Sequence, residues 1–146
     1  MRKLFIDTNI VIDLLAEREP FYEDAAKLFS LSDKNKIKLS VSSLTFANTN
    51  YLLQKTNSAS TAKEILRKFK ILTIVLSIDD KIIDLALNDS GFGDFEDAIQ
   101  YYSAIENSQE IIITRNLKEF RTSKIPVMTA SEFIKNIKTI MPATNK

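Results

Sequence analysis

The sequence predicts an α/β fold in which helices cover both faces of a mostly parallel sheet. Short apolar runs typical of buried strands alternate with longer segments whose apolar residues recur at helical spacing. No internal repeat, linker or low-complexity segment interrupts this alternation. A chain of 146 residues is the size of one domain, so we expect residues 1–140 to form a single domain and residues 141–146 a frayed tail.

The first predicted strand and helix meet at Asp7. Residues 4–6 form a short apolar run, and the apolar residues at 10, 12, 14 and 15 have the spacing of a packed helix. Asp7 therefore follows the carboxyl end of a strand, where open α/β sheets form their ligand crevices. Asp, Thr and Asn also cap helices well, and this stretch taken alone favours a cap formed by Asp7, Thr8 or Asn9.

Two further strands and four helices are predicted up to residue 88. The β-prone runs at 37–41 and 71–76 are expected to be strands. Proline at position 20 suits the first turn of a helix, and serine at 42 or 43 suits a cap. The helices are expected over 20–33, from 43 onward with 44, 47, 51 and 52 on the inner face, over 59–69, and from about 77–80 to 88.

The last third of the chain begins with a glycine-containing link, followed by a helix that opens at Asp94. Its inner face is predicted to carry residues 95, 98, 99, 102 and 105, whereas 94, 97 and 101 share another face. Residues 110–113 predict a buried fourth strand, and 124–128 an edge strand that tolerates proline. Thr129 or Ser131 is expected to cap a final helix ending near 137.

The composition excludes several kinds of chemistry. The chain has no cysteine and no histidine, which removes thiol nucleophiles, Ser-His-Asp triads and the usual zinc sites. With 20 basic and 19 acidic side chains, the net charge of +1 provides no overall attraction for nucleic acid. No signal peptide or membrane-spanning run is present, so we expect a cytoplasmic protein that does not associate with a membrane.

Acids and amides follow two of the predicted strands and open one helix. Asp7 follows the first strand, residues 114–119 follow the fourth, and Asp94, Glu96 and Asp97 lie in the opening turn of the helix. If the two strands are neighbours in a parallel sheet, these side chains converge at one edge. Converging carboxylates repel one another unless a cation lies between them, and oxygen ligands favour Mg²⁺ or Mn²⁺.

Each of these residues also has a structural interpretation. Asp94 and Asp97 suit a capping arrangement, with Glu96 favourable to the helix dipole. Tyr101 and Tyr102 are interpreted as packing residues rather than as platforms for stacked bases. Arg115 suits a phosphate contact and a surface position equally well.

Three motifs in this chain resemble those of a known family. Phe5-Ile-Asp-Thr-Asn, Asp94-Phe-Glu-Asp-Ala and Thr114-Arg-Asn-Leu-Lys-Glu-Phe are similar, in order and spacing, to the motifs of PIN domains, in particular the VapC-like ribonuclease toxins of bacterial toxin-antitoxin pairs. The resemblance implies a three-layer α/β/α sandwich, a Mg²⁺ or Mn²⁺ ion held by acids, and cleavage of RNA. It also implies a cognate antitoxin and a second copy of the chain as partners.

The resemblance assigns roles position by position. It implies that Asp7 and Asp97 are catalytic metal ligands, that Asn116 joins them in catalysis, and that Asp94 and Glu119 are further ligands. Asn48 and Asn116 stand where the family usually has acids, which lowers the charge available to a cation. The supporting residues are Thr8, Asn9, Asn48, Glu96 and Thr114, and Arg115 is the candidate contact to an RNA phosphate.

Three functions follow from these observations. The first is a metal-dependent endoribonuclease that acts as a toxin. The second, suggested by the two amides, is a degenerate PIN domain that binds RNA or a protein without cleavage. The third is an unrelated receiver-like phosphotransfer domain built on Asp7 and Asp13, which leaves the third motif unexplained.

Overall fold

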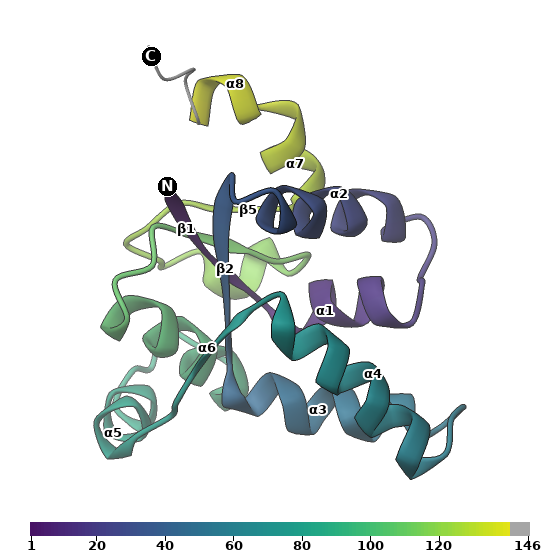
Figure 1. Cartoon of the computed structure of the whole chain (residues 1–146). Coiled ribbons are helices and arrows are strands. Elements are labelled where there is room, and N and C mark those ends of the chain that lie inside the picture. Colours follow the sequence, from purple (N-terminus) through teal and green to yellow (C-terminus); the bar gives the residue numbers. More distant parts are fainter. Residues whose placement is uncertain (141–146) are drawn as a thin grey trace.

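The computed structural model describes residues 1–140 and contains five strands and eight α-helices in that part of the chain (Figure 1). The expected tail, residues 141–146, lies outside the described residues. The strands are β1 (Arg2–Ile6), β2 (Ile37–Ser42), β3 (Ile74–Leu76), β4 (Ile111–Ile113) and β5 (Val127–Met128). The helices are α1 (Thr8–Leu15), α2 (Tyr22–Asp33), α3 (Ser43–Leu53), α4 (Ala59–Ile71), α5 (Asp80–Leu87), α6 (Phe95–Glu106), α7 (Ala130–Lys135) and α8 (Ile137–Ile140), with a 3₁₀ turn, η1 (Leu117–Phe120).

The five strands form one sheet in the order β3-β2-β1-β4-β5, and every neighbouring pair is parallel. β1 lies in the centre, with Leu4 opposite Leu39 on one side and Ile111 on the other. Because β1 and β4 are adjacent and parallel, their carboxyl ends lie at the same edge. The residues that follow them, Asp7 and Thr114, are therefore close in space, as the sequence predicted.

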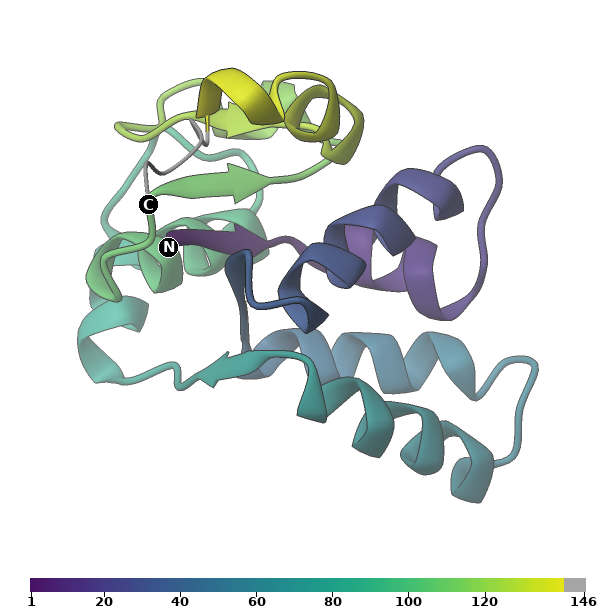
Figure 2. The same cartoon turned by 45° about the horizontal axis from the view of Figure 1, so that its top comes forward.

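The side chains of the central strands alternate between two helical layers. Leu4 and Ile6 pack in the core cluster that includes α2 and α7, whereas Phe5 packs against Tyr101 and Phe120 on the opposite face. This alternation follows from the two-residue period of a strand. Figure 2 shows the helices on either side of the sheet. The three-layer α/β/α sandwich predicted from the sequence is confirmed.

Several boundaries differ from prediction. β5 covers only Val127–Met128 of the expected strand 124–128, and the expected final helix ends at Lys135 and is followed by α8. α2 begins at Tyr22 rather than at position 20, because the amides of Phe21 and Tyr22 both donate to the carbonyl of Arg18 and close a turn ahead of the helix. α4 continues through Ile71, so β3 is shorter than the expected strand. Helix continuation places Phe69 and Leu72, three residues apart, against the same core cluster, and this packing overrides the β propensity of the segment.

The inner face of α3 is also different from the prediction. The buried residues are Thr45, Thr49 and Leu53, whereas Ala47 and Tyr51 are exposed. Thr45 forms hydrogen bonds with polar groups of α1 and α6, so this face meets a polar site rather than an apolar core. Phe95, at the start of α6, was expected in the core and is 45% exposed.

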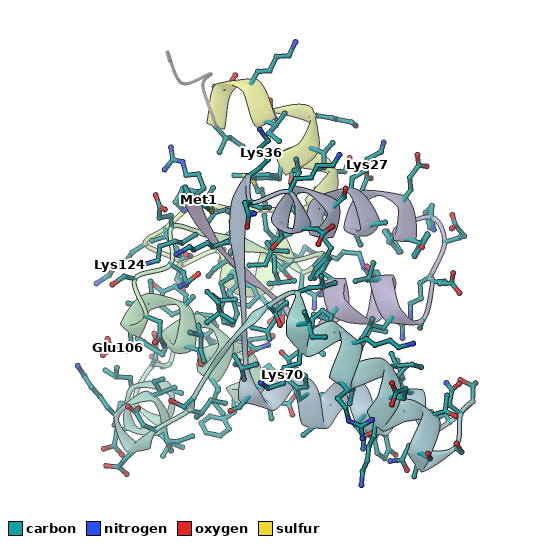
Figure 3. All side chains as sticks on the ribbon, in the orientation of Figure 1. Met1, Lys27, Lys36, Lys70, Glu106 and Lys124 are labelled. Atoms are coloured by element: carbon teal, nitrogen blue, oxygen red, sulfur yellow. The ribbon has the colours of Figure 1, made fainter. Side chains whose placement is uncertain are left out.

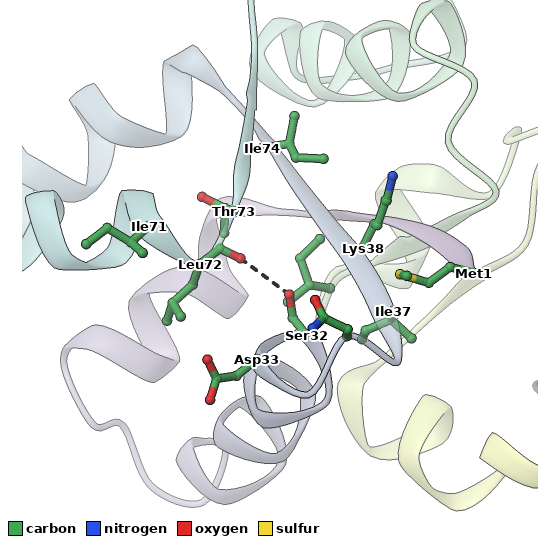
Figure 4. A pocket seen from close by; sticks show the side chains of 11 residues that line it. Met1, Ser32, Asp33, Ile37, Lys38, Ile71, Leu72, Thr73 and Ile74 are labelled. Atoms are coloured by element: carbon green, nitrogen blue, oxygen red, sulfur yellow. Dashed lines mark hydrogen bonds between the residues drawn. The ribbon is translucent and has the colours of Figure 1, made fainter.

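A cavity of about 300 Å³ lies at the amino ends of β1, β2 and β3, opposite the edge that holds Asp7. Figure 4 shows its wall, where the Ser32 hydroxyl donates to the Leu72 carbonyl over 3.4 Å. Ile71 and Ile74 border this cavity and are exposed, and no acidic cluster lines it. Among residues 1–140, no helix has the length and apolar character needed to cross a bilayer.

Candidate active site at the carboxyl edge of the sheet

Asp7 occupies the turn between β1 and α1, and only 5% of it is exposed. Its Oδ1 accepts a hydrogen bond from the Thr8 amide over 2.8 Å, so Asp7 is the helix cap that its residue type favours. Its Oδ2 accepts from the Thr114 hydroxyl over 2.7 Å. The cap and the site are therefore compatible, since the same carboxylate both caps α1 and reaches the edge of the sheet.

Helix α6 brings its acids to the same place. Asp94 caps the helix by accepting from the Glu96 amide over 2.8 Å, which confirms its predicted capping role. One turn later, Asp97 is half-buried beside Asp7 and Asp94. A cavity of about 280 Å³ lies between these elements. Its lining comprises Asp7, Thr8, Asn9, Ile12, Arg18, Leu44, Asn48, Asp94, Glu96, Asp97, Gln100 and Asn116, and we call it the acidic pocket.

The acids in this pocket disfavour one another's charge. Burial raises the pKa of Asp97, and the nearby charges of Asp7, Asp94, Glu119 and Glu96 raise it further, to about 7. Burial also raises the pKa of Asp7, while its hydrogen bonds from Thr114, Thr8 and Gln100 oppose that effect. A cation is the group that would relieve this repulsion.

Gln100 fixes the position of Asp7 and was missed by the sequence reasoning. It is 3% exposed, and its Nε2 lies 3.3 Å from Asp7 Oδ1, 3.1 Å from Thr8 Oγ1 and 3.2 Å from Thr45 Oγ1. Its Oε1 accepts from the Ser42 hydroxyl at the end of β2. The sequence feature that could have indicated Gln100 is its position on α6, one turn after Asp97, where a polar residue interrupts the buried face.

The third motif lies beside Asp7 through backbone and side-chain contacts. The Thr114 hydroxyl accepts from the Asn116 amide over 3.0 Å and from Asn9 Nδ2 over 3.3 Å. Asn116 lines the acidic pocket, whereas Glu119 does not. Glu119 lies in η1 and acts on the pocket through its charge alone, which raises the pKa of Asp97.

Arg115 points away from the acidic pocket and forms an ion pair. Its Nε and one terminal nitrogen bind the carboxylate of Asp13 over 2.7 and 3.0 Å, and its guanidinium lies 4.0 Å from the centre of the Phe21 ring. Arg115 and Asp13 therefore have a structural role, as partners in this ion pair. The ion pair also removes the receiver-like interpretation, which needed Asp7 and Asp13 to share a site.

Arg18 lines the acidic pocket, whereas Arg115, the predicted phosphate contact, does not. Arg18 belongs to the turn between α1 and α2 and is the basic residue in the lining of the acidic pocket. Asn48, from α3, lines the opposite wall. Both Tyr101 and Tyr102 pack against neighbouring aromatic rings, so their predicted role in packing is confirmed.

The donor set suits an ion such as Mg²⁺ or Mn²⁺ that keeps water or substrate ligands, rather than a metal held by protein ligands alone. Within residues 1–140, no three acids approach closely enough to hold an ion by themselves. Mg²⁺ is usually bound through one or two carboxylates, with water and substrate oxygens completing its shell. Asp7 and Asp97 supply two carboxylates and Asn48 and Asn116 supply two neutral amide oxygens to this lining, which is a donor set of that kind.

Comparison with known proteins agrees with this geometry. Residues 3–118 match the model of the PIN domain, which covers most of the chain. The chain belongs to the PIN domain family. The three motifs that carried the resemblance lie within or at the end of the matched segment, and the predicted family is confirmed.

This PIN domain is similar to a ribonuclease and to toxin-antitoxin structures. It is 28% identical over 141 residues to ribonuclease VapC1 of Aquifex aeolicus, covering 94% of this chain and 97% of the relative. Its fold matches the DNA-bound VapBC of Salmonella typhimurium with a TM-score of 0.66 at 22% identity, covering 89% of this chain and 99% of the other. A toxin-antitoxin complex from Klebsiella pneumoniae gives a TM-score of 0.66 at 24% identity, covering 87% and 97%.

Thr114→Val is expected to destabilise the protein, because it removes a hydrogen bond to Asp7. The valine keeps the shape of the side chain but removes the hydroxyl that donates to Asp7 Oδ2, leaving a buried carboxylate oxygen without this donor. We expect a loss of about 2 kcal/mol in the free energy of unfolding, measured by urea denaturation. Thr114→Ser, which keeps the hydroxyl, is the matched control. Equal losses in both variants would contradict the assignment of the effect to the hydrogen bond.

Proposed function

We propose that this PIN domain is a divalent-metal-dependent endoribonuclease and the toxin of a toxin-antitoxin pair. The observation that carries the proposal is the convergence of Asp7, Asp94 and Asp97 in one cavity at the carboxyl edge of the sheet. The pKa of Asp97 is raised to about 7 there by burial and by the charges of neighbouring acids, and a cation would relieve that repulsion. The similarity to a VapC ribonuclease supports the same function.

Asp7 and Asp97 are the proposed catalytic ligands, with Asp94 and the Asn116 amide next to them. A bound Mg²⁺ or Mn²⁺ would neutralise phosphate charge and lower the pKa of the attacking water. Thr8, Thr114 and Gln100 hold the Asp7 carboxylate in place through the hydrogen bonds described above. We assign to Asp97 the orientation of the attacking water and to Arg18 a contact with a phosphate oxygen of the RNA, and their shared position in the lining of the acidic pocket supports both roles.

Asn9, Asn48 and Glu96 complete the wall of the pocket and support this assignment of roles. Glu119 is retained only as a source of negative charge, since it lies outside the lining. Arg115 is no longer proposed as a phosphate contact, because Asp13 occupies its guanidinium.

The proposed partners are RNA, a cognate antitoxin and a second copy of the chain. Several structural neighbours are complexes of VapB with VapC or toxin-antitoxin complexes. A soluble cytoplasmic location is proposed on the same similarity.

The test of this function is RNA cleavage by the purified protein with Mg²⁺, with Mn²⁺ and with a chelator. We expect cleavage with either ion and none with the chelator, because the uncompensated acids repel a phosphate in the absence of a cation. Cleavage that persists in the chelator would contradict a metal-dependent mechanism.

A second function has its own supporting observation. Asn48 and Asn116 both line the pocket, so two positions that are acidic in the family carry no charge here. A degenerate domain of this kind would bind RNA or a protein partner without cutting it. Absence of cleavage at every metal concentration, together with retained RNA binding, would favour this second function.

A further inference from the structure

A second cavity, of about 550 Å³, lies next to the acidic pocket and shares one residue with it. It is bounded by the end of α1 and by α3 and α4. We call it the side groove, and its lining comprises Leu15, Ala16, Glu17, Arg18, Leu52, Leu53, Lys55, Thr56, Asn57 and Ile65. Arg18 lines both cavities and therefore lies where the two adjoin.

Arg18 is held by its backbone and leaves its side chain available. Its amide donates to the Asp13 carbonyl over 3.1 Å, and its carbonyl accepts from the amides of Phe21 and Tyr22 over 2.9 and 2.7 Å. Within residues 1–140, the guanidinium has neither an ion-pair partner nor a hydrogen-bond partner. An uncommitted guanidinium between the two cavities, carried on a backbone that is fixed by these hydrogen bonds, is suited to a phosphate group.

Helix α3 carries one stripe of side chains from the acidic pocket to the side groove. Asn48 lines the pocket and Leu52 lines the groove, and their four-residue spacing places both on one side of the helix. Lys55 lines the groove from the turn that follows α3. Tyr51, which precedes Leu52, lies outside the lining of both cavities and is 72% exposed. The Lys55 ammonium is 5.2 Å from the centre of the Tyr51 ring.

The net charge of the lining is negative in the acidic pocket and positive in the side groove. The acidic pocket holds Asp7, Asp94, Glu96 and Asp97 against Arg18 alone, whereas the side groove holds Arg18 and Lys55 against Glu17. An exposed aromatic ring beside a lysine, next to a groove that also holds an arginine, is a combination suited to single-stranded nucleic acid, because bases stack on the ring and cations hold the backbone.

We infer that the side groove binds the single-stranded RNA segment next to the bond that is cut, with Arg18 on a phosphate and Tyr51 stacked on a base. The inference rests on the proposed function, since it assigns a substrate path to the same site. Leu15, Leu52 and Ile65 form an apolar floor under this segment. Arg18 and Tyr51 are positioning residues and take no part in the proposed chemistry.

The test measures RNA binding without any divalent metal, so its outcome does not depend on cleavage. The probe is a fluorescein-labelled single-stranded RNA of about 12 nucleotides, followed by fluorescence anisotropy with the full chain. Tyr51→Ala is expected to weaken binding by about 5- to 100-fold, whereas Tyr51→Phe, which keeps the ring, stays within about twofold. Arg18→Ala is expected to weaken binding by about five- to tenfold and to reduce the salt dependence by about 0.7 in the log-log slope.

Lys36→Ala is the matched charge control for Arg18→Ala. Lys36 precedes β2 and lies at the opposite end of that strand from α3 (Figure 3). We expect this control to bind the single strand as the wild type does. An RNA duplex of the same length should be insensitive to Tyr51→Ala, since its bases are already stacked.

Three results would overturn the inference. The first is equal binding of the single strand by wild type, Tyr51→Ala and Arg18→Ala, which would leave the groove to a protein segment. The second is absence of any binding to the single strand by the wild type. The third is an equal effect of Tyr51→Ala on single strand and duplex. If none of these three results is found but the wild type cleaves no RNA, the proposed function is rejected and the groove remains an RNA-binding surface.

Discussion

Asp97→Asn is expected to lower RNA cleavage by about a thousandfold while the protein remains folded. Asp97 is one of two carboxylates proposed to hold the cation, and asparagine replaces a charged ligand with a neutral one of the same shape. The measurement is the rate of RNA cleavage at saturating Mg²⁺, together with the circular dichroism of the variant. Asp80→Asn is the control, since Asp80 lies in the first turn of α5 and outside the lining of the acidic pocket. Cleavage by Asp97→Asn at the rate of the control would contradict the assigned role.

The same substitution is expected to stabilise the metal-free protein. The pKa of Asp97 is raised from 3.8 to about 7, so the folded state binds the proton more tightly than the unfolded state. Stability without metal should therefore fall as pH rises from about 4 to about 7. At higher pH, Asp97→Asn should be more stable than the wild type, because asparagine carries no charge for the neighbouring acids to repel. We expect a difference of only about 1–2 kcal/mol, since this half-buried site is screened by solvent. Urea denaturation in a chelator at pH 5 and pH 8 measures both effects, and a wild type more stable at pH 8 would contradict them.

Arg115→Ala is expected to destabilise the protein by about 3–5 kcal/mol. Asp13 has 1% of its side chain exposed, and Arg115 satisfies both of its oxygens, so the alanine leaves a buried carboxylate without a partner. It also removes the guanidinium packed on Phe21. The free energy of unfolding from urea denaturation gives the magnitude. Cleavage by the folded fraction should be retained, because Arg115 does not line the acidic pocket.

Two variants separate the ion pair from other effects of Arg115. Lys118→Ala removes a cation in the neighbouring turn that has no ion pair within residues 1–140, and should change stability by less than about 0.5 kcal/mol. Asp13→Asn combined with Arg115→Ala removes the buried charge as well and should recover part of the loss. If the double variant is as unstable as the sum of both single variants, the coupling between the two residues is absent.

The sheet and the two layers of helices were predictable because they depend on local patterns. The apolar runs at β1, β2 and β4 have the length of buried strands, and acids or amides follow two of them. Parallel pairing of β1 with β4 then brings Asp7 and Thr114 together. The sequence expresses the hydrophobic period directly, whereas the adjacency of β1 and β4 was a condition of the prediction, and the structure meets that condition.

Features that depend on tertiary contacts were not predictable in the same way. The buried face of α3 carries Thr45 and Thr49, which looks like a polar surface until Gln100 is placed against it. The choice of Arg18 over Arg115 depends on Asp13, a buried acid whose ion-pair partner the sequence does not indicate. Local periodicity reports which residues are apolar, but it does not report which polar residues satisfy one another.

Calorimetric titration with Mn²⁺ tests the central claim most directly. Wild type should bind the ion at one saturable site with the release of a proton near neutral pH, since the ion displaces the proton held by Asp97. Asp7→Asn and Asp97→Asn should each weaken binding by at least about tenfold, and Asp80→Asn should leave it unchanged. Binding that is equal in all four proteins, or absent from the wild type, would contradict the claim that the acidic pocket is a metal-dependent active site.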